Sequence, residues 1–260
     1  MMENISTERI LNRLDELLSR NDYASAEEHI LYWIGEAERI YNNRTKLLLL
    51  NELAGLYRKL AKEKEALKTV ETLLNLVTDM KIENNIGAAT TYINCATVFK
   101  AFSKAEEALP LFNKAQHIYE TELEVDDERF GALYNNMALA LVDLKRFDEA
   151  IMWYQKAIKE APHLRDPYIE LALLYYEQQK YQEVYDLIKQ ALKITNHKKT
   201  YINEVFSWNE TPYDLLSISC YHLNLLPESL FYLDKAIALN KDNERLLKNK
   251  EIIEKILKEK

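Results

Sequence analysis

The chain repeats one amphipathic helix several times, and this repetition constrains its fold more than any other feature. The segment KRFDEAIMWYQKAIKEAP at residues 145–162 has a counterpart 42 residues earlier, SKAEEALPLFNKAQHIYE, and another 34 residues later, QKYQEVYDLIKQALKIT. Each combines a short polar break with apolar residues at helical spacing. Self-similarity at such periods predicts a solenoid of stacked helix pairs, because a single pair cannot bury its apolar face alone.

Mostly small residues recur at two fixed places in the repeated pattern. In the second helix of each pair they follow one another at intervals of 40, 42, 42, 34 and 45 residues, and a matching set lies twelve residues earlier, in the first helix. Because small side chains let two helices approach closely, these positions predict the contact line within each pair. The second-helix set is Ala26, Ala66, Ala108, Ala150, Val184 and Ser229, and the first-helix set is Leu14, Ala54, Ala96, Ala138, Ala172 and Ser217.

Composition excludes several classes of protein. The four glycines are widely separated, whereas a loop that cradles phosphate needs clustered glycines. The net charge of −8 argues against a general nucleic-acid binder, which needs a basic surface. The polar N-terminus is not that of a signal peptide, and no apolar run is long enough to span a membrane. We therefore expect a cytoplasmic protein that binds neither nucleic acid nor membrane.

No residues stand in a catalytic, cofactor-binding or metal-binding motif. The five histidines are scattered, and Cys95 and Cys220 are isolated thiols without metal-ligand spacing. We expect both cysteines to lie in or near the core, where a free thiol behaves as a small apolar side chain. The sequence thus predicts a non-enzymatic protein without a cofactor or a metal.

The pattern of small and aromatic residues resembles the tetratricopeptide repeat. The best matches are NCATVFKAF with AEEALPLFNKA, NMALALVDL with FDEAIMWYQKA, and LALLYYEQQ with YQEVYDLIKQA. The resemblance covers residues 7 to 258 and implies an all-α fold. The expected architecture is a right-handed α-solenoid of six helix pairs, closed by a C-terminal capping helix that covers the last pair.

The repeat spacing divides the predicted solenoid into two parts. Residues 1–164 hold four repeats spaced by 40 to 42 residues, and these longer units resemble those of kinesin light chains. The extra residues are enough to lengthen both helices of a pair. Residues 165–260 hold two further repeats, an aromatic insertion at 199–209 and the capping helix at 243–258. We expect one continuous solenoid.

The C-terminal part has a second, narrower resemblance. Through PYDLL and NERLLKN, residues 165–250 look like the module that follows the catalytic domain in some bacterial and phage family 2 glycosyltransferases. The catalytic domain and its Asp-x-Asp motif are missing. An alternative function is therefore that of an accessory module, which would supply acceptor recognition or oligomerisation to a glycosyltransferase catalytic domain on another chain. A junction of two different repeat proteins near residues 160–165, natural or engineered, is a further alternative.

In tetratricopeptide repeats the first helix of each pair lines a concave groove, and its inward positions follow from the register. Side-chain amides and carboxylates dominate those positions here. An amide can hold one peptide group of an extended ligand whatever the ligand sequence, because it both donates and accepts. The predicted peptide-binding residues are Asn12, Asn94, Asn136, Glu52, Asp143, Glu170 and Glu177.

A simpler alternative is that these residues only form the polar faces of solvated helices. It explains Asn94 and Asn136 less well, because they occupy equivalent places in adjacent repeats and Asn is a mediocre helix former. We therefore predict a scaffold that binds a neutral or basic peptide or partner segment. The Lys and Arg clamp of tetratricopeptide proteins that bind chaperone tails is absent. The sequence leaves the ligand and the oligomeric state open, including a homo-oligomer.

Overall fold

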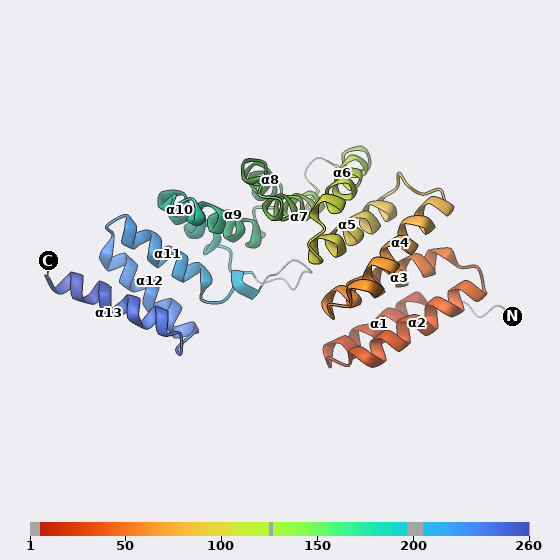
Figure 1. The fold of residues 1–260 in the computed structure, drawn as a ribbon, viewed down its shortest axis with the longest axis horizontal. Coiled ribbons are helices and arrows are strands. Elements are labelled where there is room, and N and C mark those ends of the chain that lie inside the picture. Colours follow the sequence, from red (N-terminus) through yellow and green to blue (C-terminus); the bar gives the residue numbers. More distant parts are fainter. Residues whose placement is uncertain (1–5, 125–126, 197–204, 260) are drawn as a thin grey trace. The chain divides into compact units, whose positions relative to one another are not determined.

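Every regular element in the described part of the chain is helical (Figure 1). The computed structural model describes residues 6–124, 127–196 and 205–259. The α-helices are α1 Thr7–Ser19, α2 Tyr23–Arg39, α3 Asn43–Lys59, α4 Glu63–Asp79, α5 Ile86–Ala101, α6 Ala105–Glu122, α7 Arg129–Asp143, α8 Phe147–Glu160, α9 Asp166–Glu177, α10 Tyr181–Ala191, α11 Thr211–His222, α12 Leu226–Leu239 and α13 Glu244–Glu259, with a 3-10 turn η1 at Val205–Ser207. The predicted all-α architecture of helix pairs followed by a closing helix is confirmed.

The contact line predicted within each pair is also confirmed. All twelve residues of the two small-residue sets are at most 2 % exposed. In the last pair the two positions carry serine, and each hydroxyl donates to the main-chain oxygen of the other residue, Ser217 to Ser229 at 2.9 Å and Ser229 to Ser217 at 2.8 Å. A polar side chain is tolerated there because it is small and its hydrogen bond is made.

Helix length follows the repeat spacing. The helices α3 to α6 of the long units have 16 to 18 residues. The helices α9 and α10 of the short unit have 12 and 11 residues. In the second and third pairs the added residues therefore extend both helices, as expected, rather than the turn between them, whereas α1, α7 and α8 have only 13, 15 and 14 residues.

One turn geometry joins the two helices of every pair. A single non-glycine residue adopts a positive φ in each turn, and the N–H of the next residue donates to a carbonyl of the preceding helix's last turn. In the first pair Asn21 has φ 57° and Asp22 N donates to Leu17 O at 3.0 Å. The other positive-φ residues inside pairs are Ala61, Ser103, Lys145, Gln179 and Asn224. This helix-ending motif satisfies the terminal carbonyls, and it explains how a chain so poor in glycine makes sharp turns.

The chain forms two compact units, Met1–Val125 with α1 to α6 and Asp126–Lys260 with α7 to α13. The boundary that repeat spacing suggests near residues 164 and 165 lies inside the second unit, between α8 and α9. That boundary, the continuity of the solenoid and a junction of two repeat proteins remain predictions.

The insertion is described only from residue 205 onwards, so Tyr201 lies outside the described residues. Its described end packs on the second unit. Phe206 contacts the apolar cluster of α9, α10 and α11, and the Trp208 ring lies 4.5 Å from the buried Arg165 guanidinium. Phe206 therefore packs on α9, α10 and α11, and Trp208 packs at the start of α9.

The last helix covers α12 as a capping helix should. Leu246 and Ile253 of α13 are buried against Leu233 and Ala236 of α12, and Leu257 packs at the edge of this cluster. The opposite side of α13 is mostly charged and exposed. Without α13 the apolar side of α12 would face solvent.

Replacing Gly131 by Ala should destabilise the protein by about 1–3 kcal/mol, because the added methyl overpacks a closed contact. An added Cβ would lie 2.3 Å from the Cβ of Ala161, which follows α8. Gly35→Ala in α2 is the control, since a Cβ there meets nothing within 4 Å. The control should gain roughly 0.5–1 kcal/mol from helix propensity. Urea unfolding followed by circular dichroism measures both, and a gain for Gly131→Ala would contradict the contact.

Candidate functional site

Asn94 belongs to a chain of polar contacts across the first helices of two neighbouring pairs. Its Nδ2 donates to Oδ1 of Asn51 at 2.9 Å, from α5 to α3. Asn51 Nδ2 in turn donates to Thr91 Oγ1 at 3.1 Å and to Leu47 O at 2.8 Å. Asn94 Oδ1 accepts no hydrogen bond from a described residue. The amide nitrogen of Asn94 is thus used inside the fold, whereas its carbonyl oxygen has no donor among the described residues.

The other two predicted asparagines have different surroundings. Asn136 is half-buried on α7, and its Nδ2 donates to Ala132 O of the same helix at 3.1 Å. That bond orients the amide and leaves Oδ1 without a described donor. Asn12 is exposed on α1, and its side chain has no partner among the described residues. The fold therefore fixes Asn94 and Asn136, and not Asn12.

Glu52 is the predicted acid with the most unusual environment. It is half-buried on α3, where burial and, to a lesser degree, the charge of Asp15 from α1 raise the pKa of its carboxyl above the ordinary 4.5. Two like charges on neighbouring first helices repel one another and lower stability. A cationic ligand group between them would relieve that repulsion.

Two other predicted acids converge on one buried phenol. Tyr154 of α8 is 1 % exposed, and its pKa is raised by burial, by the charge of Glu170 on α9 and by that of Asp143 on α7. The fold thus brings Asp143 and Glu170 together, although they lie in different helix pairs. Glu177 is exposed at the end of α9 and is not part of this group.

A cavity of about 310 Å³ opens between α9, α11 and α13 in the second unit. Its wall is largely aromatic and aliphatic, with one guanidinium and one amide. None of these residues is among the peptide-binding residues predicted from the sequence, which assigns α13 the role of a cap alone. Among its lining residues are Tyr176, Ile218, Tyr221, His222, Arg245, Asn249, Ile252 and Ile253.

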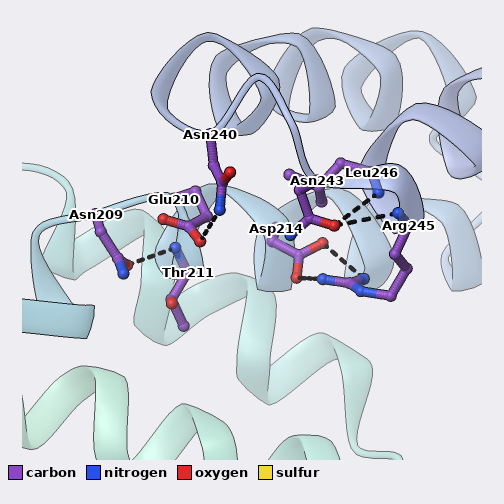
Figure 2. A network of polar contacts seen from close by, with 8 residues as sticks. All are labelled: Asn209, Glu210, Thr211, Asp214, Asn240, Asn243, Arg245 and Leu246. Carbon is purple, nitrogen blue, oxygen red and sulfur yellow. Dashed lines mark hydrogen bonds and ion pairs between the residues drawn. The ribbon is translucent and has the colours of Figure 1, made fainter.

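A polar network fixes α13 against the start of α11 (Figure 2). Arg245 donates to both carboxylate oxygens of Asp214, at 3.2 and 2.5 Å. Asn243 Oδ1 accepts the Arg245 N–H at 3.1 Å and so caps α13. Asn240 Nδ2 donates to Glu210 Oε1 at 2.7 Å. Asp214 belongs to PYDLL and Arg245 to NERLLKN, so these two motifs meet to attach the last helix.

The arrangement of the described side chains indicates neither a metal site nor a reactive thiol. Among the described residues no three His, Cys, Asp or Glu side chains come together as a metal site requires. Cys95 and Cys220 are buried, and burial raises the pKa of both thiols to about 12. Such thiols are poor nucleophiles, which agrees with their predicted role in the core.

None of the helices within residues 6–124, 127–196 and 205–259 has the length and apolar character that crossing a membrane demands.

Two family models, both described as Tetratricopeptide repeat, match residues 45–121 and 132–164. The chain is 22 % identical over 230 residues to Protein KINESIN LIGHT CHAIN-RELATED 3 of Arabidopsis thaliana, covering 84 % of this chain and 34 % of that protein. It therefore spans about a third of the length of the curated relative it matches.

Solved structures share the fold. BtubC (BKLC) from P. vanneervenii matches with a TM-score of 0.67 and 15 % identity, over 92 % of each chain. YrrB, described as a TPR protein with an unusual peptide-binding site, matches with a TM-score of 0.55 and 17 % identity, over 83 % of this chain and 97 % of that one.

Glu52→Gln should raise the thermal midpoint at pH 7 by about 1–2 °C. A carboxyl whose pKa is higher in the folded state loses stability as pH rises above its ordinary 4.5, because the folded state must give up a proton it holds more tightly. The gain should therefore shrink at about pH 4, where the carboxyl is mostly protonated in both states. Glu71→Gln, at an exposed site on α4, is the control. Equal gains at both pH values would contradict this explanation.

Proposed function

Because this chain is a tetratricopeptide-repeat protein with units similar to those of kinesin light chains, we propose that it is a non-enzymatic protein-interaction scaffold. Its ligand is an extended peptide or partner segment held along the first helices within each compact unit. The observation that carries the proposal is the state of Asn94 and Asn136. Both amides are oriented by hydrogen bonds of their nitrogens, and both carbonyl oxygens lack a donor among the described residues.

The two oxygens suit the main chain of a peptide. Each can accept one peptide N–H, a bond that does not depend on the ligand's side chains. Ordering the amides in advance lowers the entropic cost of binding. The peptide-binding description of YrrB, a protein of the same fold, agrees with this role.

The acids define the preferred charge of the ligand. Glu52 is destabilised by burial and by the charge of Asp15, and Asp143 and Glu170 are gathered around one phenol. A neutral or basic segment adds no negative charge beside these acids, whereas an acidic one would be repelled by them. We therefore assign the scaffold a neutral to basic partner.

The accessory role in a glycosyltransferase is the weaker candidate. It depends on PYDLL and NERLLKN, and the contact between Asp214 and Arg245 gives both motifs a purpose within the fold. None of the relatives described above adds support for it. A catalytic domain encoded beside this chain would restore that candidate.

Replacing Asn94 and Asn136 together by Ala should weaken peptide binding about tenfold or more, at about 1 kcal/mol for each lost hydrogen bond. Suitable probes are peptides selected on the full chain from a random display library, with affinity measured by calorimetry. Asn113→Ala, an exposed Asn on the second helix α6, is the control and should bind normally. Unchanged affinity of the double variant, with helicity intact, would move the binding surface away from these amides.

Neutralising the acids by Glu52→Gln, Asp143→Asn and Glu170→Gln should weaken basic selected peptides mainly at low salt. Long-range attraction between exposed charges is largely screened at about 0.5 M salt, so the variants should then approach the parent. The control is a triple variant with the same change in net charge, placed at exposed positions of second helices: Glu71→Gln, Glu107→Gln and Glu183→Gln. An equal loss in the control would show a general charge effect instead of a local one.

A further inference from the structure

The closing helix has the register of one more first helix. Asn249 follows Leu215 by 34 residues, the interval of the short repeats, and Leu215 occupies the place in α11 that Asn94 and Asn136 occupy in α5 and α7. Asn249 is half-exposed, and its amide has no partner among the described residues. At this position of the second unit α9 carries Glu170 and α11 the buried Leu215, so α13 presents a side-chain amide again after two positions without one.

The cavity beside Asn249 is lined by apolar surface that remains in contact with water. Ile252 of α13 is 52 % exposed and Tyr221 of α11 is 38 % exposed. Exposed apolar side chains around one hollow are typical of a binding site rather than of a simple surface. Ring packing holds the wall in place, because His222 stacks flat on Tyr181, with ring centres 3.8 Å apart and an interplanar angle of 3°.

The charges around the cavity favour an uncharged occupant. Arg245 is the one lysine or arginine among the lining residues, and its guanidinium is already paired with both oxygens of Asp214. No carboxylate lines the cavity. A cationic side chain would find no counter-charge in the wall, and an acidic one would have to compete with Asp214. An aromatic or large aliphatic side chain would replace water on the exposed faces of Ile252 and Tyr221.

We propose that this cavity binds one aromatic or large aliphatic side chain of an extended peptide while the Asn249 amide holds the adjoining peptide group. The closing helix is then part of the binding surface as well as a cap. This inference rests on the proposed peptide-binding function and adds the class of side chain that anchors the ligand.

The test uses the full chain with isoleucine methyl groups labelled for NMR. The probes are five acetylated and amidated pentapeptides with Phe, Leu, Ala, Lys or Glu between two pairs of alanines. We expect the Phe and Leu peptides to shift the methyl signals of Ile218, Ile252 and Ile253 saturably. They should bind about tenfold tighter than the Ala, Lys and Glu peptides, because only they bury a large apolar side chain.

Three variants of α13 make the assignment specific. Ile252→Asp should weaken the Phe peptide about tenfold, since it places a charge in the apolar wall. Leu247→Asp is the matched control, because Leu247 is 42 % exposed on the same helix and does not line the cavity. It should leave the affinity within about twofold. Asn249→Ala should cost roughly fivefold, the loss of one hydrogen bond.

Failure of this inference and failure of the proposed function give different results. If the five peptides bind equally and the three isoleucine signals do not move, the cavity is not an anchor site, although the scaffold still binds peptide main chain. If Leu247→Asp weakens the Phe peptide as much as Ile252→Asp, the cavity assignment is wrong. If no peptide shifts any signal, the anchor site is refuted, and the Asn94 and Asn136 double variant then decides the proposed function independently.

Discussion

The close approach of two helices at a few small residues is the constraint on which the rest of this protein depends. Ala54 and Ala66 are fully buried where α3 meets α4, and the same two positions are closed in every other pair. Because the gap is fixed by side-chain size, the helices of a pair have little freedom to slide or separate. The second helices pack behind the first ones, so the first helices are left to present polar side chains.

Polar contacts between successive pairs form on both sets of helices, and on the second helices Lys189 of α10 donates to Glu228 and Tyr232 of α12. The bond from Asn94 to Asn51 joins α5 to α3, and Tyr154 gathers Asp143 and Glu170 from α7 and α9. In both cases side chains from successive pairs meet at spacings set by the stacking. Some of these groups are held in less favourable electrostatic surroundings, as Glu52 is, which is typical of positions kept for a ligand.

The C-terminal end shows how closing a repeat array can also create a cavity. Burying Leu246 and Ile253 on α12 ends the apolar core, and the Asp214–Arg245 pair sets the angle at which α13 leaves it. Once α13 is attached there, its Ile252 side faces α11 and α9 across a cavity. A capping helix with only charged residues on that side would have ended the core equally well.

The sequence by itself determined the helix pairs, their contact line, the longer helices of the widely spaced units and the closing helix. These features are periodic and local, so they can be read from spacing. It also predicted Asn94 and Asn136 as peptide-binding amides, but it could not reveal Asn51 as a partner or Asp214 and Arg245 as a pair. Only the tertiary structure decided those contacts, because they depend on which side chains of helices about thirty to forty residues apart come to face one another.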